Sequence, residues 1–233
     1  MRQTVAQTLE KLKNPAKARF LQQFFKTGPG EYGEGDVFLG ITVPQQRAVA
    51  KQFKDADFTS LRKLLKSPVH EYRLTALIIL TLQYQGGDLP AQKKIFDFYL
   101  KQRAGINNWD LVDVSAPYIV GEYLLGRDSA ILFRLAHSKR IWDRRIAILA
   151  AFAFIKSGDF EVPLRLAEIL VFDAHDLMQK AVGWMLREVG KRSLKAEEAF
   201  LHKYAAIMPR TMLRYAIERF PEKKRLRYLR LGS

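Results

Sequence analysis

Residues 141–156, "IWDRRIAILAAFAFIK", decide the fold class. This apolar stretch is too long for a buried strand, and its apolar residues recur every three or four positions, which is typical of a helix. The same pattern recurs in the segments 73–84, 93–103 and 176–191. Breaks with glycine or proline fall at 67–68, 86–90, 157–160, 208–209 and 220–221. No alternating stretch is long enough to predict a sheet, so we predict an all-α protein whose short turns join antiparallel helices.

The three tryptophans, at positions 109, 142 and 184, lie in apolar helical segments and are separated by 33 and 42 residues. Helix pairs of roughly 35–45 residues are the unit of HEAT-like repeats. We therefore expect a curved, C-shaped solenoid that forms a single domain over residues 1–233. Its expected parts are an N-terminal helical pair (1–27), a glycine-rich connector (28–43), repeats (44–220) and a basic tail (221–233).

The segment 27–44 holds five of the fourteen glycines and two prolines. A glycine-rich loop can cradle phosphate, but this one lacks the lysine and the serine or threonine of a P-loop and follows no strand. A connector is therefore the favoured interpretation. The basic tail is either a solvated end or an added phosphate contact, and the sequence leaves both open.

The charge balance points to a polyanionic partner. The chain carries 39 Lys and Arg against 24 Asp and Glu, a net charge of +15. Nucleic acid is the most common partner of such a chain, and a generic solubilising charge is the alternative. No segment pairs a basic face with an exposed apolar one, so membrane binding is not expected.

Several chemistries lack their residues in this sequence. There is no cysteine, which excludes a disulfide or a thiolate metal site and fits an intracellular setting. The four histidines show no metal-ligand spacing, and no Ser-His-Asp or nucleophile-elbow motif is present. We expect neither a metal nor a cofactor. The N-terminus lacks a signal-peptide core and no run is long enough to cross a bilayer, so we predict a cytoplasmic, nucleoid-associated protein.

The stretch 106–125, "INNWDLVDVSAPYIVGEYLL", reads as one helix with an apolar stripe. Trp109 and Asp113 are four residues apart and share a face, which Val120 continues. Burying an unpaired carboxylate costs several kcal/mol, so Asp113 needs a partner. The basic run at 143–145 could supply a purely structural ion pair; the alternative is a carboxylate held for a cationic ligand.

Two further pairs combine an indole with a cation: Trp142 with Arg145, and Trp184 with Arg187. Taken singly, a tryptophan in an apolar helix is usually a core residue and an arginine is usually solvated. If the repeats stack, their equivalent faces align, with arginines for phosphates and indoles for sugars or bases. A carboxylate among them would stabilise the positive charge that develops on a sugar losing its base, and could align the attacking water.

Four segments (28–47, 107–117, 140–149 and 177–191) occur in the order and spacing of a known family. On these residues the sequence resembles the AlkD-type alkylpurine DNA glycosylases, which are DNA alkylation repair proteins built of HEAT-like repeats. The resemblance implies that Trp109 packs against the deoxyribose of the damaged nucleotide and that Trp184 is a second indole that contacts a sugar. It also implies that Asp113 is the essential carboxylate beside the glycosidic bond, and that Arg145 and Arg187 contact backbone phosphates.

The predicted activity is therefore monofunctional hydrolysis of the N-glycosidic bond of cationic N3- and N7-alkylated purines in duplex DNA. The base is expected to stay outside any pocket, and the enzyme to act as a monomer. The alternative is a non-catalytic HEAT-like module that binds distorted or branched DNA. A protein–protein scaffold would favour a neutral or acidic face, against which the net charge argues. The predicted catalytic residues are Asp113, Trp109, Trp184 and Arg145, and the predicted DNA-binding residues are Arg145, Arg187, Arg144, Trp142 and Lys191.

Overall fold

The computed structural model describes residues 3–231, and the chain divides into two compact units, Met1–Ile119 and Val120–Ser233. Within the described range the protein is helical, with a single isolated bridge between Val37 and Val69 in place of any strand. The all-α prediction is confirmed. None of the helices between residues 3 and 231 is long and apolar enough to cross a membrane.

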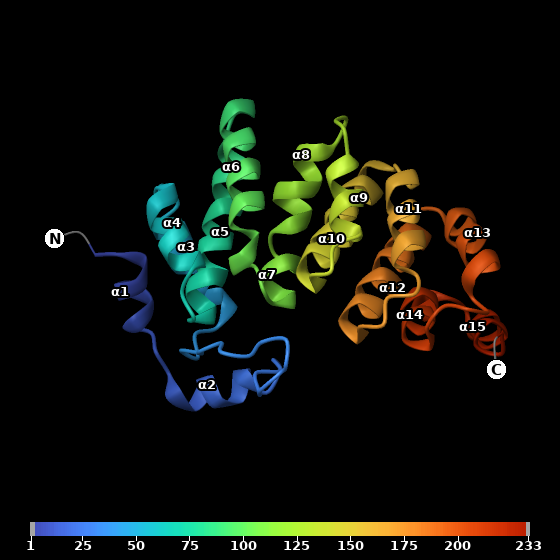
Figure 1. The fold of residues 1–233 in the computed structure, drawn as a ribbon, viewed down its shortest axis with the longest axis horizontal. Helices are drawn as coiled ribbons and strands as arrows, with labels where there is room; N and C mark the ends of the chain where they lie inside the picture. The colour runs from blue at the N-terminus through green and yellow to red at the C-terminus, as the bar shows by residue number, and fades with distance from the viewer. Residues whose placement is uncertain (1–2, 232–233) are drawn as a thin grey trace. The chain divides into compact units, whose positions relative to one another are not determined.

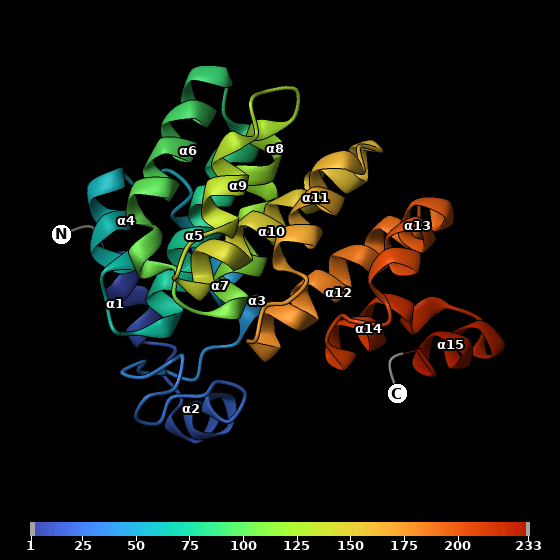
Figure 2. The same ribbon diagram turned by 45° about the vertical axis from the view of Figure 1, so that its right-hand side comes forward.

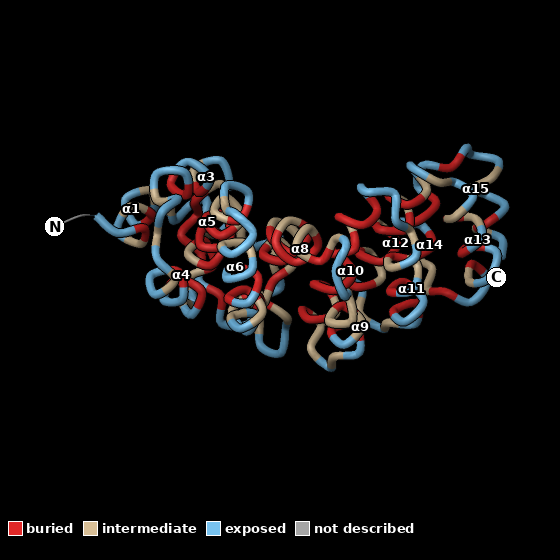
Figure 3. The backbone as a smooth tube through the Cα atoms, turned by 90° about the horizontal axis from the view of Figure 1, so that it is seen from above, coloured by how far each residue is buried: buried red, intermediate tan, exposed pale blue. Residues whose placement is uncertain are grey.

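Unit 1 is built around its longest helix (Figures 1 and 2). Its helices are α1 (Val5–Glu10), α2 (Pro15–Gln22), α3 (Val43–Gln52), α4 (Phe58–Leu65), α5 (His70–Gly86), α6 (Leu89–Gln102), the 3-10 turn η1 (Arg103–Gly105) and α7 (Trp109–Asp113). Helices α3, α4, α6 and α7 all contact α5. Most of the α5 residues are buried, so α5 forms the centre of this core (Figure 3).

Unit 2 consists of paired helices around α10 and α12. Its helices are α8 (Glu122–Leu124), α9 (Ala130–Ala136), α10 (Ile141–Ser157), α11 (Glu161–Leu170), α12 (Asp176–Gly190), α13 (Leu194–Tyr204), α14 (Arg210–Ala216), the 3-10 turn η3 (Ile217–Arg219) and α15 (Glu222–Leu229). Helix α10 contacts α9, α11 and α12, and α12 contacts α13 and α14. Each helix therefore buries one face against its sequence neighbours, as repeats of helix pairs do.

Local sequence signals place the helix ends. Asn14, Asp57 and Asp88 each accept a backbone N–H from the first turn of the following helix, which satisfies a donor without an intrahelical partner. Gly158 ends α10 in the left-handed conformation, with φ at +85°. The helices predicted over 73–84, 93–103, 141–156 and 176–191 correspond to α5, α6, α10 and α12, and the predicted breaks fall at the ends of helices or between them.

The stretch 106–125 is not one helix, which corrects the prediction. Helix α7 ends at Asp113, a five-residue segment with π-type bonding (Pro117–Gly121, η2) follows, and α8 begins at Glu122. Proline at position 117 has no N–H to donate back into the preceding turn, so the helical bonding is interrupted there. The Ser115 hydroxyl donates to the Leu111 carbonyl at 2.5 Å at this interruption.

The glycine-rich segment 28–43 packs against unit 1 instead of spanning freely between α2 and α3. Gly40 has a φ of +81°, and a Cβ there would lie 2.2 Å from the Asn14 carbonyl oxygen, so only glycine fits. The Val37 N–H donates to the Pro68 carbonyl at 3.0 Å, and the His70 N–H donates to the Val37 carbonyl at 2.9 Å. The segment is therefore a structural part of the unit as well as a connector.

The basic tail is helical over α15, where Tyr228 is buried and packs edge-on against Phe220 at 5.6 Å. Most of its cationic side chains remain on the surface of that helix.

Candidate functional site

Each unit carries part of the set of predicted residues. Trp109 and Asp113 lie on α7 in unit 1. The other six lie on α10, on α12 or directly after α12 in unit 2: Trp142, Arg144, Arg145, Trp184, Arg187 and Lys191.

Helix α7 holds Trp109 at its first position and Asp113 at its last. Asn108 caps the helix, with its Oδ1 accepting the Trp109 N–H at 2.8 Å, and Asp110 Oδ1 accepts the Leu111 N–H at 2.8 Å. Leu111 and Val112 are completely buried and anchor the helix in the core. Asp113 is half-buried and interacts with at least one other group of the protein. The predicted pair therefore lies on one short, well-anchored helix.

The indole of Trp109 is held by a group of aromatic rings. It stacks on Phe25, with 5.4 Å between ring centroids and 14° between planes. Phe25 packs in turn against Phe38 at 4.9 Å and against the imidazole of His70 at 4.8 Å. Trp109 itself is only half-buried. The indole is therefore fixed on one side while part of its surface stays accessible.

A buried ionic network contacts the start of α7. The imidazole of His70, the first residue of α5, reaches Asp110 Oδ2 through Nε2 at 2.7 Å and Asp36 Oδ2 through Nδ1 at 3.3 Å. Arg73 Nη2 lies 2.6 Å from Asp36 Oδ1, and Asn108 Nδ2 donates to Asp36 Oδ2 at 3.3 Å. The network joins the glycine-rich segment, α5 and α7. Among residues 3–231, neither this network nor any other group of three or more His, Asp or Glu side chains could hold a metal ion.

The charged groups of this network stabilise one another's ionised forms. Burial by itself would lower the pKa of His70, but the negative charge of Asp110 and the hydrogen bonds that His70 donates to Asp110 and Asp36 outweigh burial and raise the pKa to about 9. Burial would likewise raise the pKa of Asp36, yet hydrogen bonding to His70 and the charge of Arg73 lower it. His70 is therefore an imidazolium at neutral pH and donates from both ring nitrogens.

Glu71, the next residue of α5, binds the backbone of the segment before α3. Both of its carboxylate oxygens accept the Leu39 N–H at 3.0 Å, and Oε1 also accepts the N–H groups of Gly40 at 2.8 Å and Ile41 at 3.2 Å. The side chain is only 2% exposed. This carboxylate pairs with backbone donors in place of a cation, which compensates for its burial.

In unit 2, Trp184 is half-buried on α12 and is fixed through its indole nitrogen. Its Nε1–H donates to Glu188 Oε1 at 3.3 Å, and the same carboxylate accepts Lys191 Nζ at 2.5 Å and Arg192 Nη1 at 3.3 Å. Burial would raise the pKa of Glu188, but these donors outweigh burial and lower it. An indole and two cations thus lie around one ionised carboxylate.

Arg187 and Lys191 are the predicted phosphate contacts of α12. Arg187 forms an ion pair with the exposed carboxylate of Glu218 on η3. The Lys191 side chain is 41% exposed beside Glu188. Both cations already have a carboxylate partner, and both partners would have to share them with a bound phosphate.

The three predicted residues of α10 are packed into unit 2. Trp142 is 5% exposed, so its ring is part of the core of unit 2, which the recurrence of tryptophans in the sequence did not reveal. Arg144 is bound to Asp173, with Nε 2.6 Å from Oδ2, and to the carbonyls of Ser138 and Lys139. Arg145 is 5% exposed and donates to the Leu177 carbonyl at 2.8 Å. Arg144 and Arg145 thus hold neighbouring segments of unit 2 together.

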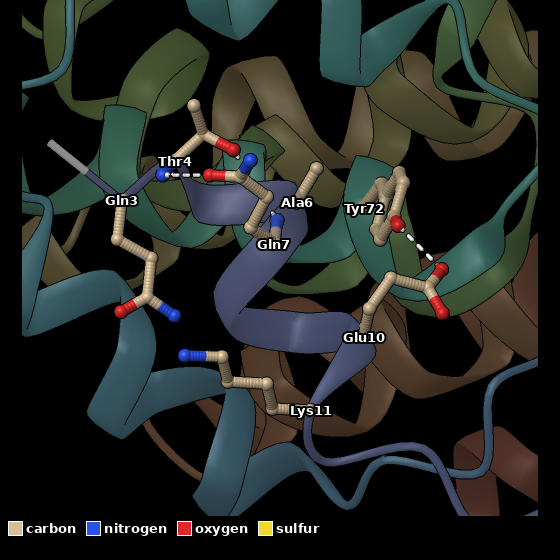
Figure 4. A pocket seen from close by; sticks show the side chains of 7 residues that line it. All are labelled: Gln3, Thr4, Ala6, Gln7, Glu10, Lys11 and Tyr72. Carbon is tan, nitrogen blue, oxygen red and sulfur yellow. Dashed lines mark hydrogen bonds between the residues drawn. The ribbon is translucent and has the colours of Figure 1, made fainter. Parts of the chain in front are cut away.

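A cavity of about 750 Å³ that is open to solvent lies elsewhere in unit 1, between α1 and Tyr72 of α5 (Figure 4). Its polar groups pair with one another: Tyr72 donates to Glu10 at 2.6 Å, and the Thr4 N–H donates to Gln7 at 2.9 Å. None of the predicted site residues lines it.

The sequence does not predict the ionic network at the start of α7. Asp36, His70 and Asp110 are separated by 34 and 40 positions, so no local motif joins them. His70 has no histidine near it in the sequence, so no local pattern singles it out. The acid next to a tryptophan in "NWD" at 108–110 is a signal that the sequence does contain.

A family model described as "DNA alkylation repair enzyme" matches residues 5–220. Three solved structures are similar to this chain. A predicted DNA alkylation repair enzyme from Enterococcus faecalis has a TM-score of 0.70 at 18% identity, over 90% of this chain and 97% of that one. AlkD2 from Streptococcus mutans has a TM-score of 0.56 at 19% identity, over 78% and 91%. The protein smu.31 from Streptococcus mutans UA159 has a TM-score of 0.53 at 18% identity, over 89% and 96%. No curated protein matches the sequence.

Proposed function

Because the chain belongs to the DNA alkylation repair enzyme family, we propose that it is a DNA glycosylase for cationic N3- and N7-alkylated purines in duplex DNA. The observation that carries the proposal is the pairing of a fixed, half-buried indole with a half-buried carboxylate on the five-residue helix α7. An anion placed beside DNA weakens simple binding to a polyanion, so its presence favours a role in chemistry.

The proposed reaction uses the charge of Asp113. An alkylated purine already carries a positive charge, so it leaves with the electron pair of the C1′–N bond and needs no acid to protonate it. The sugar becomes electron-poor as the bond breaks, and a carboxylate stabilises that state more than the neutral sugar. Water then adds to C1′, and Asp113 is proposed to accept its proton. The reaction consumes only water.

Trp109 is proposed to support the sugar of the damaged nucleotide. Its indole is held from behind by Phe25, so it offers a rigid apolar surface with little entropy to lose on binding. In unit 2, Trp184 is proposed as the second indole that contacts a sugar, with its ring held by Glu188. Both rings are half-buried, which suits a contact surface.

Four cations of unit 2 are proposed to contribute to binding in two different ways. Arg187 and Lys191, whose side chains are 16% and 41% exposed, are proposed as phosphate contacts, because each pairs with a carboxylate and can share its charge with a bound phosphate. Arg145 is proposed as a phosphate contact whose guanidinium is oriented by the Leu177 carbonyl at the start of α12. Arg144 is proposed to support DNA binding indirectly, because its ion pair with Asp173 holds α10 to the segment before α12. Trp142 is proposed to support DNA binding by packing in the core of unit 2.

Replacing Asp113 by asparagine tests the proposal. We expect Asp113→Asn to bind alkylated duplex DNA at least as tightly as the original protein. We expect it to release 7-methylguanine at least about 100-fold more slowly. Asp97→Asn, which removes the same charge from an exposed position on α6, is the matched control and should excise normally. Full excision by Asp113→Asn would overturn the assigned role. Tight DNA binding with no base release by the unmodified protein would leave a binding module instead.

A further inference from the structure

Helix α7 is too short to hold its own position. A five-residue helix makes few internal hydrogen bonds and is unstable in isolation, so its place is set by tertiary contacts. Two of these contacts flank Trp109: Asn108 is bound to Asp36, and Asp110 is bound to His70. The first turn of α7 is therefore held from the side of α5 and of the glycine-rich segment.

His70 is the member that connects both sides. Its Nε2 reaches Asp110 on α7 at 2.7 Å, and its Nδ1 reaches Asp36 at 3.3 Å, while its ring stacks on Phe38 at 4.8 Å and 18°. The ring also contacts Phe25, on which Trp109 stacks. A movement of this imidazole would therefore displace α7 through its contact with Asp110, and also through Phe25, which stacks on Trp109.

The two hydrogen bonds of His70, to Asp36 and to Asp110, can both be donated only by the imidazolium form. The charged groups around the ring are Asp36 from the glycine-rich segment, Arg73 and Glu71 from α5, and Asp110 from α7. Glu71 is satisfied by backbone N–H groups and Arg73 pairs with Asp36, which leaves Asp110 for His70. A neutral imidazole carries one N–H and could not donate to both carboxylates.

We propose that His70 is a positioning residue for the reaction: through Asp110 it fixes the first turn of α7, and with it Trp109 and Asp113. This inference rests on the proposed function for its catalytic consequence. A misplacement of the reacting groups by about 1 Å can lower a rate on the order of 100-fold. A contact that fixes the start of a five-residue helix therefore affects the reaction rate.

Two substitutions at position 70 separate the tethering role from a general packing role. The amide nitrogen of glutamine lies near the position of Nε2, so His70→Gln keeps a donor for Asp110 and loses the one for Asp36. The amide nitrogen of asparagine lies near Nδ1, so His70→Asn keeps a donor for Asp36 and releases Asp110. Both remove the charge and the aromatic stack, so each serves as the packing control for the other.

The first measurement is single-turnover excision of 7-methylguanine, together with DNA affinity. We expect His70→Asn to lower the excision rate on the order of 100-fold and His70→Gln less than about 10-fold, with DNA affinity unchanged in both. Equal losses in the two variants, or no loss in either, would overturn the positioning role. A fall in affinity without a fall in rate would also overturn it.

Hydrogen exchange at the amides of α7 keeps the inference testable without excision. If the unmodified protein releases no base, the proposed function fails, but positioning still predicts less protected α7 amides in His70→Asn than in His70→Gln. Equal protection would reject the positioning role alone. The two failures are therefore distinguishable.

Asp110→Asn provides the second variant if both substitutions at position 70 prevent folding. The asparagine oxygen still accepts from Nε2, but the loss of the negative charge makes His70 easier to deprotonate. We expect the α7 protection factors, corrected for intrinsic exchange, to fall at a lower pH than in the unmodified protein. The same pH dependence in both proteins would contradict the role of His70.

Discussion

The indole of Trp109 and the phenyl ring of Phe25 are stacked, with 5.4 Å between their centroids and 14° between their planes. Phe25 lies after the C-terminal end of α2, and Trp109 begins α7. A residue expected to touch DNA is therefore positioned by a ring that lies more than eighty positions earlier in the chain. This contact makes the N-terminal helices relevant to the site without requiring that they touch DNA.

Phe25→Leu should loosen Trp109. The substitution keeps most of the apolar volume but removes the contacts with three rings, so we expect a loss of about 1–2 kcal/mol in the free energy of unfolding. Urea denaturation measures it. Phe24→Leu is the control, since Phe24 is 60% exposed and should change stability little. A larger loss for Phe24→Leu than for Phe25→Leu would contradict the importance of the stack.

Glu71→Gln should destabilise unit 1. The carboxylate accepts from three consecutive backbone N–H groups, and an amide would turn an NH₂ group toward some of those donors. We expect a loss of about 2–4 kcal/mol in the free energy of unfolding, as for buried hydrogen bonds to a charged acceptor. Thermal unfolding compares it with Glu34→Gln, whose acceptor lies in an exposed turn. Equal melting temperatures for the two variants would refute this account.

Glu197→Gln should make unit 2 more stable at alkaline pH. Burial, followed by the charge of Glu198, raises the pKa of Glu197 to about 8, and its Oε1 is buried without a hydrogen-bond partner. The folded state thus holds this proton more tightly than the unfolded state, where the pKa is near 4.5. Stability from this group is complete below pH 4.5 and falls as the pH rises toward 8.

A neutral amide does not titrate, so Glu197→Gln should unfold at a higher urea concentration than the unmodified protein at pH 9 and show little difference at pH 4.5. The expected gain at pH 9 is a few kcal/mol at most. Glu222→Gln, at an exposed carboxylate, is the control. A gain of the same size at both pH values would exclude titration of Glu197 as its cause.

Glu218→Gln should strengthen binding to duplex DNA. Glu218 pairs with Arg187, so its neutralisation releases the guanidinium for phosphate and removes one negative charge from the protein. We expect several-fold tighter binding, and a slope of log K against log salt that is steeper by up to about 0.9. Arg187→Ala should change the slope in the opposite direction. Filter binding or fluorescence anisotropy over a salt series measures both, and unchanged slopes would exclude Arg187 as a phosphate contact.

The helical elements followed from the sequence because their cause is local. Residues 141–156 carry apolar side chains at helical spacing, and α10 runs over Ile141–Ser157. N-cap residues such as Asp57 and Asp88 begin α4 and α6 through hydrogen bonds to the backbone three positions later. The exception is the stretch 106–125, where the apolar pattern continues past Pro117 although the helical hydrogen bonding cannot.

The environment of the candidate residues was less predictable. Trp142 and Trp184 have the same spacing to an arginine, yet Trp142 is buried in the core and Trp184 is only half-buried. Periodicity tells which residues share a helix face, but not how deeply a neighbouring helix covers that face. The glycine-rich segment shows the same limit, because its attachment to Glu71 and His70 joins residues some thirty positions apart.

The helical class, the main helix boundaries and the basic character follow from local sequence, as does the placement of Trp109 and Asp113 four positions apart on one helix. The pairing of each acid, the accessibility of each indole and the contacts of His70 with Asp36 and Asp110 become visible only in the folded protein. The difference is one of range. Helix propensity and capping depend on neighbours within about four residues, whereas the ionisation and orientation of a buried side chain depend on groups that only folding brings into contact.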